Sequence, residues 1–149
     1  MELNVLRATE TWQQAGAYYV RIQGMARQHH ITLREEFDEH DTPDTKYIVL
    51  LDGDFPVATC RLYALQDEEI PTVMFGRIVV LPEYRKHGLG RTVVMEAEKW
   101  ARDLGFQKAV LDSRDVAVGF YEKLGYTGDY SRTVKSWAFT CIHMEKNLV

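Results

Sequence analysis

The sequence predicts an α+β fold with α/β-type layers, in which one mixed β-sheet carries helices on both sides. In the first half of the chain, the pair Asp52-Gly53 separates two apolar runs, a pattern typical of an antiparallel hairpin. In the second half, strand-like and helix-like apolar spacings alternate, which predicts at least one parallel strand pair with helices packed on the sheet.

The first half predicts one helix, four strands and an acidic stretch. In order, these are a strand over residues 3–7, a helix capped by Thr9 or Thr11 with apolar residues at 18, 19, 22 and 25, an acidic stretch over 34–44, and strands over 46–51, 57–65 and 73–81. Pro82 ends the last of these strands because it cannot continue a central ladder.

The second half predicts two helices and two strands. They are a helix over 92–104 with its apolar stripe at 93, 94, 97, 100, 101 and 104, a short strand over 108–111, a helix over 116–124, and a last strand over 138–144. Gly105 and Gly125 are natural helix ends. Glu98 and Arg102, four residues apart, are expected on the solvent side of the first helix.

Length and composition indicate an ordinary globular domain over residues 1–149. Of the 149 residues 46% are apolar and 27% charged, and the net charge of -4 argues against sequence-independent nucleic-acid binding. No apolar run approaches the ~20 residues of a membrane span, and no signal peptide is visible. From the charge and the apolar runs we therefore expect neither nucleic acid nor a membrane as partner. Because Cys60 and Cys141 stand alone, we expect a reduced, cytoplasmic setting.

A basic, glycine-containing turn precedes the helix at Thr92. Helix starts normally favour acidic side chains, yet this one gathers three full cations in an acidic protein. Two glycines let the backbone approach a ligand closely and offer its N–H groups. The pattern predicts a phosphate cradle at a helix N-terminus, with a solvated basic loop as the alternative. Its residues are Arg85, Lys86, His87, Gly88, Leu89, Gly90 and Arg91.

The kind of phosphate ligand stays open at this point. No Lys follows Gly90, so a Walker A loop is not supported. The dinucleotide fingerprint is half met, because Val93 replaces its third glycine, although Asp112 lies where a ribose contact would be expected. A nucleotide-binding module is therefore a rival hypothesis, opposed by the small number of strand–helix units that follow.

Two separated motifs resemble the GNAT superfamily of acyl-CoA-dependent N-acyltransferases. Arg85-x-x-Gly88-x-Gly90, with the lead-in Pro82-Glu83-Tyr84, is similar to that family's Arg/Gln-x-x-Gly-x-Gly/Ala loop. The run from Phe120 to Tyr126 (FYEKLGY) resembles its second signature. The resemblance follows the order of elements over residues 46–148 and is closest over 78–126.

The resemblance implies a mixed sheet of about six to seven strands, splayed between the strand ending at Leu81 and the strand ending at Asp112. The pantetheine arm of acetyl-CoA would lie in that opening and pair with backbone groups of Ile78, Val79 and Val80. The N–H groups of residues 86–91 would hold the pyrophosphate. Acetyl-CoA would be a co-substrate, and no metal is implied.

The resemblance also implies that Tyr121 is the general acid that protonates the leaving thiolate, with aromatic packing on the sheet as its alternative role. Phe120 would pack beside the co-substrate, and Lys123 would approach the CoA phosphates. Ser113 stands near the place where the family often has an Asn that bonds pantetheine, so it could replace that contact.

The acceptor and the general base are not identified by the sequence. A small-molecule or peptide amine is implied as acceptor, and a homodimer is an open oligomeric state. The acidic residues Glu35, Glu36 and Asp38 either line the acceptor side or form a solvated loop. The histidines His29, His30 and His40 either move a proton or lie at the surface. Glu83 is expected to serve the turn that precedes the helix, and His143, on the last strand, is expected to be structural. The resemblance thus implies an N-acetyltransferase acting through a ternary complex, with a non-catalytic acyl-CoA-binding regulatory module as the alternative.

Overall fold

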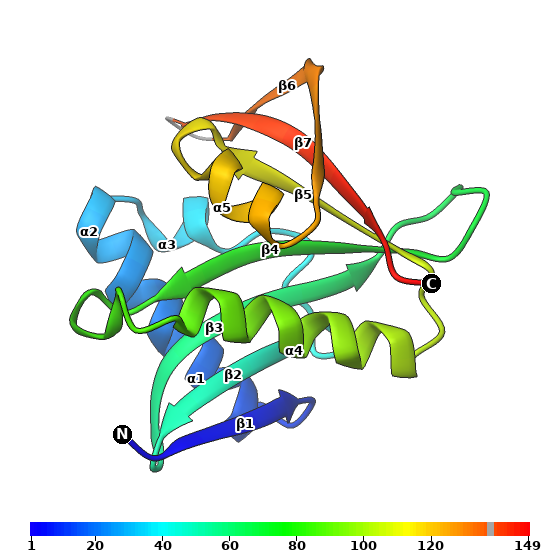
Figure 1. The fold of residues 1–149 in the computed structure, drawn as a ribbon. Helices are drawn as coiled ribbons and strands as arrows, with labels where there is room; N and C mark the ends of the chain where they lie inside the picture. The colour runs from blue at the N-terminus through cyan, green and yellow to red at the C-terminus, as the bar shows by residue number, and fades with distance from the viewer. Residues whose placement is uncertain (137–138) are drawn as a thin grey trace.

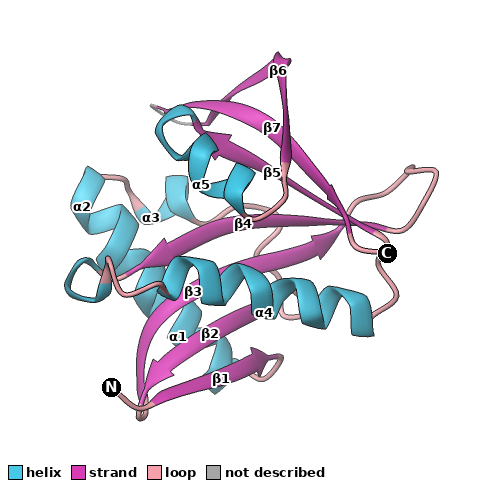
Figure 2. Cartoon of the chain, in the orientation of Figure 1, coloured by secondary structure: helices cyan, strands magenta, loops and turns pink. Residues whose placement is uncertain are grey.

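The computed structural model describes residues 1–136 and 139–149. In these residues one sheet of seven strands has the order β1-β2-β3-β4-β5-β7-β6, with helices on both faces, as the sequence predicts (Figures 1 and 2). The strands are β1 (Leu3–Ala8), β2 (Lys46–Asp52), β3 (Phe55–Ala64), β4 (Thr72–Val80), β5 (Lys108–Arg114), β6 (Thr127–Ser136) and β7 (Phe139–Asn147).

The helices connect these strands. They are α1 (Thr11–Arg21), continued by the π-helical turn η1 (Ile22–Ala26) and by α2 (Arg27–His29), then α3 (Leu33–Glu36), α4 (Leu89–Asp103) and α5 (Val118–Lys123). Two 3-10 turns, η2 (Pro82–Tyr84) and η3 (Asp115–Ala117), precede α4 and α5. None of the described helices is long and apolar enough to cross a membrane.

Several predicted boundaries shift for physical reasons. Helix α1 begins after Glu10, not after a threonine cap, because the Gln13 side chain accepts hydrogen bonds from the backbone N–H groups of Thr9 and Glu10 (both 3.0 Å). Helix α4 begins three residues before the predicted start, at Leu89, because the glycine turn itself opens the helix. The predicted start of the last strand at residue 138 lies outside the described residues.

Strand β6 was not predicted. It pairs antiparallel with β7 at the edge of the sheet, and nearly all of its residues are exposed. Without a buried face it lacks the apolar alternation by which a strand is recognised in a sequence.

The sheet opens between its two central strands. β4 and β5 are parallel and pair only from Thr72–Phe75 against Lys108–Leu111, although β4 continues to Val80 and β5 to Arg114. Figure 1 shows the two strands together near the C-terminus and diverging toward α2 and α5. The splay that the family resemblance implied is therefore confirmed at this position.

A β-bulge in β4 coincides with the opening. Thr59 faces Val79 and Arg61 faces Gly76, so Cys60 alone stands opposite the two residues Arg77 and Ile78. Arg77 has a φ of 49°, a left-handed conformation that non-glycine residues rarely adopt. An extra residue of this kind bends a strand and increases its twist, which turns the end of β4 away from β5.

Helix α4 covers one face of the sheet, and its apolar stripe is buried as predicted except at Leu104, which is 43% exposed. The solvent position predicted for Glu98 is wrong. Its carboxylate is 4% exposed, accepts a hydrogen bond from the Tyr126 hydroxyl (2.7 Å), and pairs with the Lys146 ammonium (3.0 Å). Glu98 thereby ties α4 to the segment after α5 and to β7.

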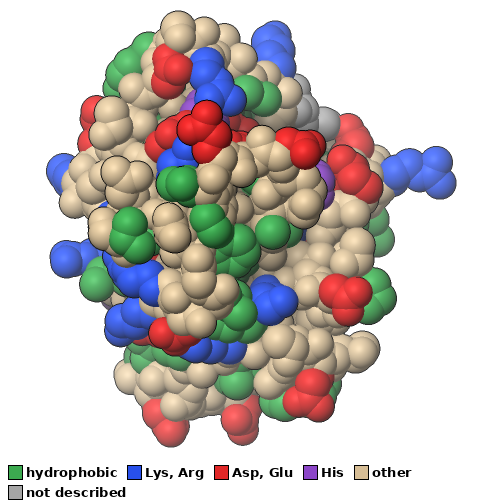
Figure 3. Space-filling model, turned by 90° about the vertical axis from the view of Figure 1, so that its right-hand side faces the viewer, with side chains coloured by type: hydrophobic (Ala, Val, Ile, Leu, Met, Phe, Trp, Pro, Cys, Tyr) green, Lys and Arg blue, Asp and Glu red, His purple; other side chains and the backbone are tan. Residues whose placement is uncertain are grey.

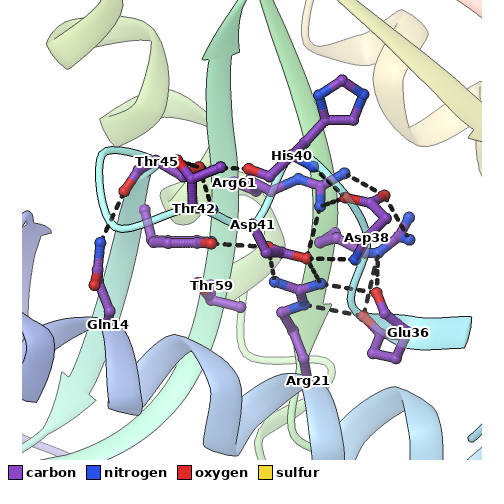
Figure 4. A network of polar contacts seen from close by, with 12 residues as sticks. Gln14, Arg21, Glu36, Asp38, His40, Asp41, Thr42, Thr45, Thr59 and Arg61 are labelled. Atoms are coloured by element: carbon purple, nitrogen blue, oxygen red, sulfur yellow. Dashed lines mark hydrogen bonds and ion pairs between the residues drawn. The ribbon is translucent and has the colours of Figure 1, made fainter. Parts of the chain in front are cut away.

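Three of the six carboxylates in the acidic stretch, those of Glu35, Glu39 and Asp44, are exposed. The other three are paired with three arginines in a partly buried ion network (Figure 4). Its members are Arg21, Arg61 and Arg77 with Glu36, Asp38 and Asp41. The three positive and three negative charges balance, so the network holds α3 and the loop after it against β3 and β4.

Asp41 shows how strongly this network is coupled. Burial alone would raise the pKa of its carboxyl group, but hydrogen bonds and the positive charge of Arg21 outweigh burial and lower it. Arg21 is fully buried and also bonds Glu36 (2.9 Å from Nε to Oε2). Figure 3 shows a different situation on the surface, where acidic and basic side chains are mixed over one face of the molecule.

We expect Arg21→Met to lower the free energy of unfolding by about 3–5 kcal/mol, because it leaves buried carboxylates short of a partner. Arg7→Met is the control, since the pair between Arg7 and Asp103 is exposed and is worth less than about 1 kcal/mol. Urea denaturation of the three proteins measures both changes.

The same comparison has a pH dependence. Because the folded pKa of Asp41 is lowered, its contribution is complete above the unfolded value of about 4 and is lost as the pH falls toward the folded value. The stability difference between the wild type and Arg21→Met should therefore shrink below about pH 4. A difference that stays constant on acidification would contradict this account of the network.

Candidate active site

A cavity of about 670 Å³ fills the opening between β4 and β5. The end of β4, the end of β5 and helix α5 form most of its wall, and η1 and α3 close it from the N-terminal side. The residues that line it are Gly24, Met25, His29, Ile31, Glu35, Glu36, Phe75, Gly76, Arg77, Ile78, Val79, Val80, Arg85, Leu111, Asp112, Ser113, Arg114, Ala117, Phe120, Tyr121, Ser136, Phe139 and Cys141.

The end of β4 presents backbone groups to this cavity. Val79 and Val80 pair with β3 on one side, whereas on the β5 side the pairing stops at Phe75. Ile78, Val79 and Val80 all line the cavity. On the edge that faces β5, the Val80 carbonyl oxygen accepts a hydrogen bond from Arg85, and β5 pairs with no residue after Phe75. An extended ligand can therefore add to this edge as a strand.

The predicted glycine turn lies at the N-terminus of α4, and its backbone resembles the anion-binding turns that are called nests. Lys86 and Gly88 have positive φ values of 67° and 76°, and Gly88 directly precedes the first residue of the helix. Such a turn points successive N–H groups toward one place, where the helix N-terminus adds its positive end. A Cβ atom on Gly88 would meet no other atom within 4 Å, so this side of the turn is open.

The side chains of the turn divide into two groups. Lys86, His87 and Arg91 are exposed, whereas Leu89 is buried in the core and offers only its backbone to a ligand. Arg85 is exposed as well, but its guanidinium is engaged by backbone carbonyl groups. Its guanidinium donates to the carbonyl oxygens of Val80 (3.1 Å) and Gly24 (3.2 Å), and so joins the end of β4 to η1.

Tyr121 lies on α5 and lines the cavity while being only 8% exposed. Its ring meets the rings of Phe120 and Tyr126 edge to face, with centroids 5.0 and 6.0 Å apart. Burial, together with the nearby Cys60, raises the pKa of its phenol. Among the described residues none hydrogen-bonds its hydroxyl, so Tyr121 presents a protonated, unengaged O–H at neutral pH.

Of three further residues predicted to contact the co-substrate, two line the cavity and one lies outside its wall. Ser113 is buried, lines the cavity, and donates its hydroxyl to the Arg114 carbonyl oxygen (2.8 Å). Phe120 also lines the cavity, and its Cζ atom would be 3.3 Å from a Cβ on Gly90. Lys123 is exposed and lies outside the cavity wall.

Only some of the residues considered as general base line the cavity. His29, Glu35 and Glu36 line the cavity, but Glu36 is paired with Arg21 and Arg77. Glu35 accepts hydrogen bonds from the backbone and hydroxyl of Thr32. The other candidates lie outside the cavity wall; they are Asp38, Glu83, His30, His40 and His143.

The sequence did not indicate several residues of the cavity. Gly24 brings η1 against β4, and its only signal was a glycine inside a helical pattern. Asp112 was singled out as a ribose contact and lies in the cavity wall. The sequence did not predict that Arg77 and Arg114 line the cavity, because it predicted neither the bulge at Arg77 nor the extension of β5 beyond residue 111.

The two cysteines are poor nucleophiles in this structure. Cys60 is fully buried, and burial raises the pKa of its thiol. Cys141 lines the cavity but is 4% exposed, and burial raises the pKa of its thiol as well. Among the described residues, no group of three or more His, Cys, Asp or Glu side chains is arranged to hold a metal ion.

Comparison with known proteins gives the class to which this fold and cavity belong. Residues 6–126 match the model of the acetyltransferase (GNAT) family. A Bacillus subtilis protein named as an acetyltransferase is 32% identical over 126 residues, which cover 83% of each chain. The chain therefore belongs to the GNAT acetyltransferase family, whose members transfer acyl groups from acyl-CoA to amines.

Solved structures show the same fold. A crystal structure from Lactobacillus plantarum, named as an N-acetyltransferase, covers 100% of both chains with 29% identity and a TM-score of 0.90. The PaiA N-acetyltransferase of Thermoplasma acidophilum, solved in complex with coenzyme A, is 16% identical, covers 99% of both chains and has a TM-score of 0.71. At that identity the second likeness supports the fold alone.

We expect Gly24→Ala to destabilise the protein by about 1–3 kcal/mol, because a Cβ there would be 2.6 Å from Cγ1 of the buried Val79. Gly119→Ala is the control: its Cβ would meet nothing within 4 Å, so helix propensity should stabilise α5 slightly. Urea denaturation measures both.

A double mutant tests the assigned cause. Gly24→Ala should cost less in a Val79→Ala background, where the obstructing methyl group is gone. Equal costs in both backgrounds would mean that the contact with β4 does not limit this position.

Proposed function

We propose that this protein transfers an acetyl group from acetyl-CoA directly to an amine within a ternary complex. One observation carries the proposal: the cavity between β4 and β5 has a buried phenol, Tyr121, in its wall and extends to Arg85, directly before the open glycine turn that starts α4. Since the sheet that forms this cavity contains strands from both ends of the chain, we also propose one domain over residues 1–149.

In this proposal the co-substrate lies along the end of β4. The pyrophosphate accepts hydrogen bonds from the N–H groups of residues 86–91, and the pantetheine arm pairs with Ile78, Val79 and Val80. The exposed cations Lys86 and Arg91 add favourable charge at the turn. Ser113 and Phe120 contact the arm from the β5 side, whereas the exposed Lys123 can reach only the outer phosphates.

The chemistry follows from the groups around the thioester. The amine nitrogen attacks the carbonyl carbon, and the developing oxyanion needs a preorganised donor, for which the Val80 N–H is our candidate. The C–S bond then breaks, and Tyr121 gives its proton to the departing thiolate. Because burial raises the pKa of Tyr121, the phenol stays protonated and available at neutral pH.

Direct transfer is favoured over an acyl-enzyme route. Such a route needs an activated nucleophile in the cavity, and the thiol pKa values of Cys60 and Cys141 are both raised. The acceptor must therefore enter while acetyl-CoA is bound. The half of the cavity bordered by His29, Asp112 and Arg114 is the space left for it.

We expect Tyr121→Phe to lower turnover by about 100-fold or more while leaving CoA affinity within about threefold, because the phenol acts on the leaving group. Thiol release measures turnover, and calorimetry measures affinity. Tyr126→Phe is the matched control, since its hydroxyl bonds Glu98 outside the cavity. That variant should lose stability and keep turnover. Unchanged turnover in Tyr121→Phe would support the non-catalytic alternative.

We expect Gly88→Ala to weaken CoA binding at least tenfold, because a side chain then stands in the cradle. Gly105→Ala is the control, since Gly105 also has a positive φ, at the other end of α4, and also has nothing within 4 Å of a Cβ. Both variants carry a similar backbone strain of about 1 kcal/mol. If the two variants bind CoA equally well, the cradle is not at this turn.

A further inference from the structure

We propose that Asp112 is the general base that removes a proton from the acceptor amine, and that His143 and Glu145 position its carboxylate. This inference rests on the proposed acyl transfer and adds the proton acceptor that the reaction requires. The neutral amine nitrogen becomes positively charged as the C–N bond forms, so a base near the carbonyl must take a proton from it.

Asp112 is the first residue of β5 beyond the point where β4 and β5 stop pairing. The last paired residues of the two central strands are Phe75 and Leu111, so a continued ladder would have paired Gly76 with Asp112. A Cβ atom on Gly76 would meet only Nη2 of Arg61, 4.0 Å away, so the β4 side of this position is sparsely filled. Asp112 lines the same cavity as Tyr121, and its side chain is 26% exposed.

The carboxylate is held from the opposite side by β7. Asp112 faces His143 directly in the antiparallel β5–β7 ladder, and Oδ1 lies 3.2 Å from Nδ1 of the imidazole. The other ring nitrogen, Nε2, lies 2.8 Å from Oε2 of Glu145. Each ring nitrogen thus lies within hydrogen-bond distance of a carboxylate oxygen, and both donate when the imidazole carries a proton on each nitrogen. His143 thereby fixes one oxygen of Asp112.

The second oxygen of Asp112 is available to a substrate. Within the described residues, no donor hydrogen-bonds Oδ2. The electrostatic surroundings of this arrangement are mixed, with acidic and basic groups on several sides. Around Asp112 and the two residues behind it lie Tyr63, Arg114, Cys141, Asp129, Lys108 and Arg132.

The other acids of the cavity are less suited to this task. Glu36 shares its Oε2 between the guanidinium groups of Arg21 and Arg77, so this oxygen is already engaged. Glu35 caps α3 through Thr32. Of these carboxylates, Asp112 is the one held by a histidine rather than by an arginine.

The proton and electron balance is simple. The amine nitrogen forms a bond to the thioester carbon and gives one proton to Oδ2 of Asp112, while the C–S bond breaks and Tyr121 protonates sulfur. The amide and CoA leave, Asp112 loses its proton to water entering the open cavity, and Tyr121 regains one from solvent. No further reactant is required.

The first test compares Asp112→Asn with Asp115→Asn, in which the replaced carboxylate is exposed and accepts a hydrogen bond from the backbone N–H of Val116. Thiol release with acetyl-CoA and a reactive amine should fall at least 100-fold in Asp112→Asn and stay near wild type in the control. CoA affinity by calorimetry and the thermal unfolding temperature should change little in either. Wild-type turnover in Asp112→Asn would overturn the assignment.

Two further variants separate a base from a merely structural residue. In Asp112→Ala, added formate should restore part of the rate in proportion to its concentration, because it supplies a carboxylate to the vacated space. His143→Asn keeps a donor near the Nδ1 position and should retain most of kcat, whereas His143→Leu should lose about tenfold in kcat at unchanged acetyl-CoA KM. Absence of formate rescue, or equal kcat in the two His143 variants, would contradict the proposal.

The outcomes distinguish this inference from the proposed function. If the wild type transfers acetyl to no amine in a broad screen, the proposed function fails and the assignment of Asp112 fails with it. If the wild type is active and Asp112→Asn is equally active, only the assignment of the base fails.

Discussion

The structure depends on one local event, the loss of pairing between β4 and β5 after Phe75 and Leu111. A parallel pair that simply ended there would leave two rows of backbone groups without partners. The bulge opposite Cys60 instead bends β4 away while it stays paired with β3, so one row of groups faces a cavity rather than the core. A co-substrate that adds itself as a strand satisfies these groups, which is why the cavity suits an extended thioester.

The ion network explains how the opening is kept. Arg77, the residue with positive φ in the bulge, reaches Glu36 and Asp38, while Arg21 and Arg61 hold the same loop from α1 and β3. A strained backbone conformation persists only when its surroundings fix it. Here Glu36 and Asp38 hold Arg77, and Arg21 and Arg61 hold these two carboxylates in place. Glu36, Asp38 and Asp41 thus support the wall of the cavity, and three arginines already balance their charge when a cationic amine arrives.

Sequence reasoning succeeded where a local pattern carries the information. The glycine turn before α4, the motif that contains Tyr121, and the hairpin at Asp52-Gly53 were all predicted and all occur. It failed where tertiary contacts decide the outcome. Strand β6 has no buried face, Glu98 is buried only because Lys146 and Tyr126 reach it, and the pairing of the acidic loop involves residues up to 41 positions apart. No window of the sequence contains those partners.

The groups of the proposed reaction are also brought together only by the tertiary structure. The groups that would bind the thioester belong to β4, whereas Tyr121 and Asp112 belong to α5 and β5 on the other side of the opening. The distance between the bound carbonyl and the acid and base is therefore set by how far the sheet opens, and not by either half alone. Changes in the bulge or in the network around Arg77 should alter kcat more than co-substrate affinity, since the binding edge of β4 would survive while its separation from the proton-transfer groups changed.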